Sequence, residues 1–173
     1  MKKVLRFIVI GIFALAVLFF SLGLFIPTFS FDNVVEVNKP IEKTFAEFND
    51  VSNMYKWIPG FQFIEPISGW PNEVGSKWKL VVKQEGKRME LIKTMTAYKE
   101  NEVFAFNLSN EMMSNDIEIV FTSKGQRTLI TAHNKVSGKN IFWKSLFVVS
   151  KSYFKNVQQK SYEKLKIVIE EKN

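Results

Sequence analysis

The sequence predicts an α+β domain in which a bent antiparallel sheet of about seven strands surrounds a long C-terminal helix, with one N-terminal transmembrane helix in front. Three observations support this prediction. An uncharged run of 20 residues, Phe7–Ile26, comes first. Short alternating segments follow, without the long connections that parallel strands require. The last segment has apolar residues at steps of three or four, which is typical of an amphipathic helix.

The apolar run Phe7–Ile26 is long enough to cross a bilayer. At about 1.5 Å per residue, a helix of this length measures about 30 Å, the thickness of the hydrocarbon core. Lys2, Lys3 and Arg6 precede the run, so the positive-inside rule predicts a cytoplasmic N-terminus and a domain outside the cytoplasmic membrane. A cleaved signal peptide is the alternative, but such cores are usually shorter and no A-x-A-like site follows. We therefore expect residues 1–26 to form an uncleaved, single-pass anchor.

The rest of the chain is expected to be one domain, residues 33–173, joined to the anchor by a short linker over residues 27–32. A hydrophobic content of 46% in 173 residues is enough for a sizeable core. The chain has no cysteine and one histidine, His133, which excludes disulfides and a cysteine nucleophile and leaves little material for a metal site. We expect no metal, no cofactor and no catalytic residue.

The first elements of this domain are a strand and two short helices. Val35 and Val37 lie in an alternating segment, which predicts the strand. Pro40 is typical of the first turn of a helix, and an apolar face follows it. Residues 50–60 begin with an aspartate and end in Pro-Gly, which predicts a second, shorter helix.

The middle of the chain predicts a meander of about six strands. Glycine-containing turns such as Glu85-Gly86 separate the alternating segments. The clearest of these segments lie at about residues 78–82, 89–98, 103–108, 117–122 and 128–136.

The last segment, from about Asn140 to Glu171, predicts one long helix with lysines opposite its apolar face. Eight lysines against three glutamates lie between Lys139 and Lys172. Such a face can attract nucleic acid or anionic lipid, or can simply be solvated. No zinc site, reading helix or phosphate loop accompanies it, so we expect no nucleic-acid partner and favour a solvated face, with membrane contact left open.

Three motifs follow one another along the chain, and their order and spacing are more specific than any one of them: VVEVNKPIEKTFAEFND at 34–50, NMYKWIPG at 53–60 and PNEVGSKWKLVV at 71–82. With the predicted elements, residues from about 33 to 170 resemble the SRPBCC, or START-like, superfamily, and within it the polyketide cyclase/dehydrase and lipid-transport proteins. The resemblance implies a helix-grip fold, in which the sheet wraps the last helix around a cavity that commonly holds a hydrophobic ligand. Some relatives catalyse cyclisation or dehydration and many only bind or carry. The superfamily has no universal catalytic motif, so no catalytic residue is transferred.

If the sheet is bent in this way, one face of each strand and of the last helix lines the cavity. Any single position is more often plain core packing, and the set as a whole is better evidence than any member. A cavity of about 300–1,000 Å³ with few polar groups would suit a lipid-like ligand. The predicted lining consists of Trp57 at the mouth; Trp78, Leu80, Val82, Met89, Leu91, Met95, Phe104, Phe106, Ile117, Ile119 and Phe121 on the strands; and Phe142, Leu146, Val149, Tyr153, Phe154 and Val157 on the helix.

The residues able to do acid–base chemistry are predicted to face outward. His133 alternates with apolar neighbours on its strand, and Arg88 and Glu90 point outward if Met89 and Leu91 point inward. No Gly-x-Ser-x-Gly elbow is present, which argues against acyl-transfer catalysis.

The sequence therefore predicts a membrane-anchored binding or carrier domain for a hydrophobic or lipid-like small molecule. The anchor and a composition rich in Lys, Asn, Ile and Phe indicate a bacterial source. A cyclase/dehydrase-type enzyme is one alternative and would need polar groups converging in the cavity. A ligand-free module that binds a partner protein is another, and would show a packed interior.

Overall fold

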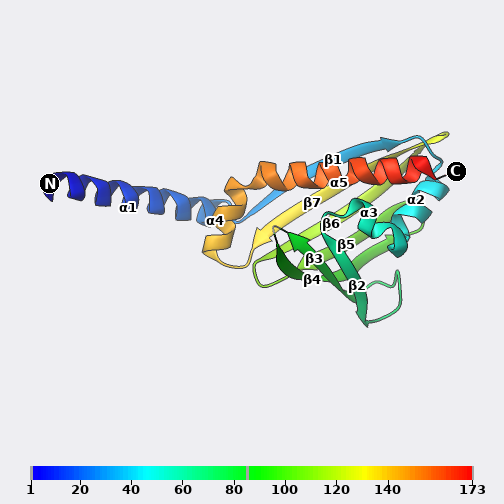
Figure 1. The fold of residues 1–173 in the computed structure, drawn as a ribbon, viewed down its shortest axis with the longest axis horizontal. Coiled ribbons are helices and arrows are strands. Elements are labelled where there is room, and N and C mark those ends of the chain that lie inside the picture. The colour runs from blue at the N-terminus through cyan, green and yellow to red at the C-terminus, as the bar shows by residue number, and fades with distance from the viewer. Residues whose placement is uncertain (1, 85, 173) are drawn as a thin grey trace.

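The structure, a computed structural model that describes residues 2–84 and 86–172, has one seven-stranded antiparallel sheet, a long helix lying on it and an apolar helix extending away from it (Figure 1). The helices are α1 (Lys2–Phe25), α2 (Ile41–Asn49), the 3₁₀-helix η1 (Val51–Asn53), α3 (Met54–Trp57), α4 (Ile141–Val149) and α5 (Lys151–Glu171). The strands are β1 (Thr28–Val37), β2 (Phe61–Ser68), β3 (Lys77–Gln84), β4 (Lys87–Lys99), β5 (Val103–Ser109), β6 (Met113–Lys124) and β7 (Arg127–Gly138).

The strand order is β1-β7-β6-β5-β4-β3-β2, so consecutive strands from β2 to β7 are neighbours and β1 pairs with the last strand. This arrangement confirms the predicted fold class. Of the predicted turn Glu85-Gly86, Glu85 lies outside the described residues. Gly86 has a φ of +81°, a conformation that favours glycine, and Gln84 pairs with Lys87 across this turn.

Strand β1 begins at Thr28, so residues 28–32, which we expected in a linker, belong to the sheet. Phe29 and Phe31 are buried and pack with Phe147 of α4, while Ser30 and Asp32 are outward members of the same strand. Polar residues that are typical of a linker are here one face of an alternating strand. Helix α1 is thus separated from the sheet by only two residues.

Strand β2 is not among the segments that the sequence clearly places as strands, and its position explains why. It lies at the edge of the sheet, carries Pro66 and leaves most of its side chains exposed. Its pairing with β3 shifts register between Phe61 and Phe63 and again between Pro66 and Ser68. Such irregularities bend a strand and interrupt the alternation that would reveal it.

The predicted single C-terminal helix is divided at Ser150 into α4 and α5. Ser150 has φ −89° and ψ 7°, outside the regular helical region. Helix α4 packs against α1 and β7, whereas α5 lies along β1 (Figure 1). Because of this division, the short apolar helix α4 contacts α1 while α5 remains packed on the sheet.

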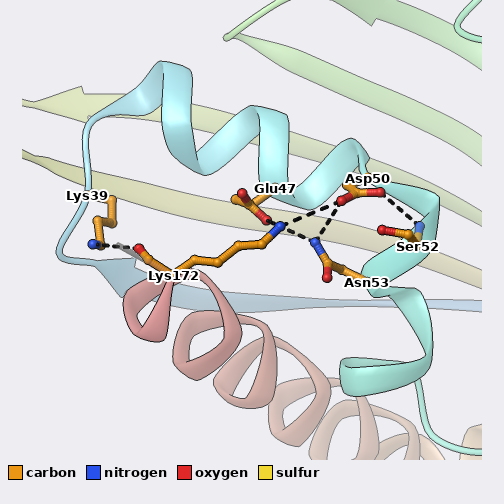
Figure 2. A network of polar contacts seen from close by, with 6 residues as sticks. All are labelled: Lys39, Glu47, Asp50, Ser52, Asn53 and Lys172. Atoms are coloured by element: carbon orange, nitrogen blue, oxygen red, sulfur yellow. Dashed lines mark hydrogen bonds and ion pairs between the residues drawn. The ribbon is translucent and has the colours of Figure 1, made fainter.

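A polar network ties the end of α5 to the helices that close the sheet (Figure 2). The Lys172 ammonium lies 2.8 Å from Oε2 of Glu47 and 3.7 Å from Oδ2 of Asp50. Asn53 donates to both carboxylates at 2.9 Å, and Asp50 accepts from the Ser52 N–H at 2.9 Å, so that it caps η1. The hydrogen bond with Ser52 lowers the pKa of Asp50 below its usual value. The network fixes α2, η1 and α3 over one end of the domain.

Candidate functional site

An apolar cavity of about 160 Å³ lies between the sheet and the middle of α5. Strands β2 to β6 form its floor, the segment from α2 to Pro59 closes one side, and α5 covers it. It is smaller than the cavity we expected, because Phe48, Met54 and Trp57 belong to the core cluster and fill this end of the sheet. Trp57 stacks on Tyr162 of α5, with ring centroids 6.5 Å apart.

Six of the residues that the sequence predicts for the cavity lie on its wall. They are Trp57, Leu80, Phe104, Phe106, Ile117 and Ile119. They come from α3, β3, β5 and β6, and the aromatic pair Phe104 and Phe106 meets edge to face at 5.8 Å.

The other predicted strand residues do not reach this cavity. Val82 and Leu91 are buried in a small cluster with Leu80, and Met89 packs against that cluster. Met95 and Phe121 belong to the main core. Trp78 and Met95 line a second, smaller pocket of about 130 Å³, which shares Met54, Ile64 and Lys93 with the first.

The predicted helix residues lie away from the cavity. They are Phe142, Leu146, Val149, Tyr153, Phe154 and Val157, and none is on its wall. Phe142, Val149 and Tyr153 are 47%, 63% and 52% exposed, and Phe154 packs under α4 with Phe29. The division at Ser150 explains the difference, because it places residues 141–149 against α1. The later residues Gln158, Ser161 and Tyr162 face the cavity instead.

Lys93 is the charged residue on the cavity wall, and it is not among the residues predicted to line it. It lies on the inward face of β4, between Leu91 and Met95, and is only partly exposed. Its Nζ lies 4.6 Å and 5.0 Å from the ring centroids of Phe104 and Phe106. Burial lowers its pKa from 10.5 to about 8. The signal was present in the sequence, since the alternation Met89, Leu91, Lys93, Met95 places a lysine on an apolar face.

Lys93 is the sole charged side chain on the wall among residues 2–84 and 86–172. Within the same residues, none of the ion pairs includes it. Its ammonium is therefore held by two aromatic rings rather than by a carboxylate.

The remaining polar groups of the wall are neutral. Burial raises the pKa of the Tyr162 phenol, so this group stays protonated at neutral pH. Ser161 donates its hydroxyl to the Val157 carbonyl at 3.0 Å. The Trp57 Nε1–H is buried and has no hydrogen-bond partner among the described residues. Apart from Lys93, the wall is therefore neutral and largely apolar.

The candidate acid–base residues on the strands lie outside the cavity, as predicted. His133 pairs with Asp32 through Nδ1 at 2.9 Å on the outer face of the sheet, and its side chain is 47% exposed. Arg88 and Glu90 form an exposed ion pair of 2.9 Å.

No protein-family model matches the sequence, and no curated protein does. Solved structures do match. Ara h 8.0201 superposes with a TM-score of 0.65 at 15% identity, over 82% of this chain and 97% of its own. A conserved protein from Geobacillus kaustophilus gives a TM-score of 0.67 at 14% identity, over 82% and 95%.

A third structure, the di-domain ARO/CYC StfQ from the steffimycin biosynthetic pathway, gives a TM-score of 0.67 at 9% identity. The match covers 83% of this chain and 52% of StfQ, so this chain spans about half the length of that protein. At these identities the likeness concerns the fold. This chain has the helix-grip fold of the Bet v1-like, or SRPBCC, proteins.

Proposed function

We propose that this protein is a membrane-anchored domain that binds a hydrophobic small molecule between its sheet and α5. The observation that carries the proposal is the apolar cavity under α5, which has aromatic walls. Its neighbours in fold are Bet v1-like proteins and ARO/CYC polyketide cyclases, which supports a hydrophobic ligand. Apolar burial would supply most of the affinity, at about 25 cal/mol per Å² before the cost of ordering the ligand.

Binding is better supported than a cyclase/dehydrase-type reaction. Such chemistry needs acid and base groups that converge on the substrate. Among the described residues, the ionisable groups on the wall are Lys93 and Tyr162, and His133 lies on the opposite face of the sheet. A packed, ligand-free module is disfavoured by the cavity itself.

The packing of α1 supports a retained anchor. Helix α1 is long and apolar enough to cross a membrane, with a mean hydropathy of 2.8 over its most apolar window. Its last turns pack against α4: Gly23 is buried, and a Cβ placed there would lie 2.4 Å from Oγ of Ser145. Because these turns are part of the packing of the domain, we favour an uncleaved anchor. The basic residues before the apolar run favour a cytoplasmic N-terminus and the domain on the outer side.

The same contact would bring α4 to the membrane surface. The ring of Phe142 lies 6.0 Å from that of Phe19, and Phe19 is seven residues before Ile26, the end of the apolar run. At about 1.5 Å per residue this is about 10 Å inside the run. Helix α4 also exposes Ile141, Phe142 and Val149. We infer that α4 rests in the outer leaflet, where a hydrophobic ligand would be close to the domain.

The test is ligand binding by the full chain in phosphatidylcholine nanodiscs, measured by titration calorimetry with decan-1-ol and with empty nanodiscs as reference. Phe106→Asp places a charge on the cavity wall and should abolish binding. Phe63→Asp makes the same change on the exposed side of β2 and should leave binding intact. Circular dichroism checks that both variants fold. Equal binding by wild type and Phe106→Asp, or none by wild type, would contradict the proposal.

A further inference from the structure

The cavity combines an apolar interior with a single ammonium group, and this combination limits the kind of ligand that the cavity can bind. A lysine on a strand usually keeps its ammonium in water while its stem covers apolar surface. Lys93 instead turns its Nζ over Phe104 and Phe106, both of which line the cavity. Holding an ammonium at such a wall is unfavourable unless a partner or a function compensates for it.

The protein does not supply that partner within the residues described, 2–84 and 86–172. The lowered pKa of Lys93 has burial as its cause, with no neighbouring charge contributing. Other lysines of the sheet are treated differently: Lys79 pairs with Glu65 at 2.5 Å and Lys99 with Glu102 at 2.6 Å. The ammonium at the cavity wall is thus left with the aromatic rings alone.

We propose that the ligand is an amphipathic monocarboxylic acid, whose carboxylate pairs with the Lys93 ammonium while its apolar chain fills the cavity. This inference rests on the proposed function and narrows it to one class of ligand. The wall offers one positive charge, which a single carboxylate neutralises, whereas a phosphate monoester would bring up to two negative charges.

Lys93 lies where the main cavity adjoins a second pocket, which leaves room for a polar headgroup beside it. Lys93 lines both the main cavity and the smaller pocket next to it, which is bounded by the turn residues Pro71 and Asn72. A carboxylate at this point would keep part of its hydration while the chain of the ligand extends toward Ile117 and Ile119. A hydrogen bond between charged groups in such a site is stronger than one between neutral groups.

The test compares four ligands with the same ten-carbon chain: decanoic acid, decan-1-ol, decylamine and decyl phosphate. Binding to the full chain in phosphatidylcholine nanodiscs is measured at neutral pH, with empty nanodiscs as reference. The variants are Lys93→Met, which keeps the length and removes the charge, and Lys93→Arg, which keeps the charge. Lys99→Met is the matched control, because Lys99 is an exposed lysine on the same strand.

Wild type should bind decanoic acid at least about tenfold more tightly than decan-1-ol, as one ion pair with partial burial allows. Lys93→Met should lose this preference and still bind decan-1-ol, whereas Lys93→Arg and Lys99→Met should keep the preference. Equal affinity of wild type for acid and alcohol, or an unchanged preference in Lys93→Met, overturns this inference and leaves the proposed function standing. Tighter binding of decyl phosphate or decylamine overturns the choice of a carboxylate. Failure of all four ligands to bind overturns both proposals.

Discussion

Replacing Lys93 with methionine should stabilise the protein at neutral pH, because the substitution removes a charge from an apolar wall. The pKa of Lys93 falls from 10.5 to about 8. Each pH unit of such a difference corresponds to about 1.4 kcal/mol, so the charge costs about 3 kcal/mol of folding free energy. The cation–π contact of the ammonium with Phe104 and Phe106 stabilises the folded protein by about 1 kcal/mol, and the methionine variant does not make this contact. We therefore expect Lys93→Met to raise the free energy of unfolding by about 2 kcal/mol.

The stability gain of Lys93→Met should decrease as the pH rises. At pH values below about 8, Lys93 is protonated in both the folded and the unfolded protein, and the full cost is present. Between about 8 and 10.5 the folded protein has released the proton while the unfolded chain still holds it, so the stability of the wild type rises with pH. The advantage of Lys93→Met should therefore be largest below about pH 8 and should shrink as the pH approaches 10.5.

The assay is urea unfolding of the full chain in a nonionic detergent, followed by tryptophan fluorescence from about pH 6 to about pH 10.5. Lys99→Met serves as the control and should change stability by less than about 0.5 kcal/mol at every pH. Two results would refute the reasoning: a Lys93→Met protein that is less stable than wild type at pH 7, or a difference that does not change between pH 7 and 10.5.

Two further predictions concern the contacts that hold the helices. Gly23→Ala should destabilise the packing of α1 on α4 by about 1–3 kcal/mol in thermal melts, because its Cβ would clash with Ser145. Gly11→Ala is the control and should melt as wild type does, since nothing lies within 4 Å of that position. Asp50→Ala should remove the cap of η1 and lower the free energy of unfolding by about 1 kcal/mol. Because hydrogen bonding with Ser52 lowers the pKa of Asp50, this loss should be present above pH 3.8 and should disappear as the pH falls below it; an equal loss at pH 7 and pH 2 would contradict this account.

The fold was predictable because its central elements have clean periodicity. Strands such as β6 alternate buried and exposed positions over most of their length, and α5 carries its apolar residues on one face. The elements that were missed lack this signal for physical reasons. Strand β2 is an exposed edge with Pro66 and two register shifts, and the division of the C-terminal helix at Ser150 is marked by no proline or glycine. The division is accompanied by tertiary packing, since α4 packs against α1 and β7.

The site was less predictable, because an apolar residue can be buried in more than one place. Phe106 and Ile119 are on the cavity wall as predicted, whereas Val82 and Phe121 have the same pattern and do not reach it. Which inward side chains line the cavity depends on where α3 and α5 pack on the sheet. The period of a strand gives the face of a residue and says nothing about what covers that face.

Charged side chains are usually exposed and large aromatic ones usually buried, and Lys93 and Phe142 are exceptions of the two kinds. Lys93 is a charged residue held at an apolar cavity, and Phe142 is a large aromatic residue that is 47% exposed. Contact with Phe104 and Phe106 compensates only in part for the charge of Lys93, and the described residues leave about half of Phe142 exposed. A carboxylate ligand would compensate for the first and a bilayer for the second. A domain seated on a membrane, as proposed, would have both partners close to it, so loss of the α1–α4 contact in Gly23→Ala should also weaken uptake of decanoic acid from vesicles.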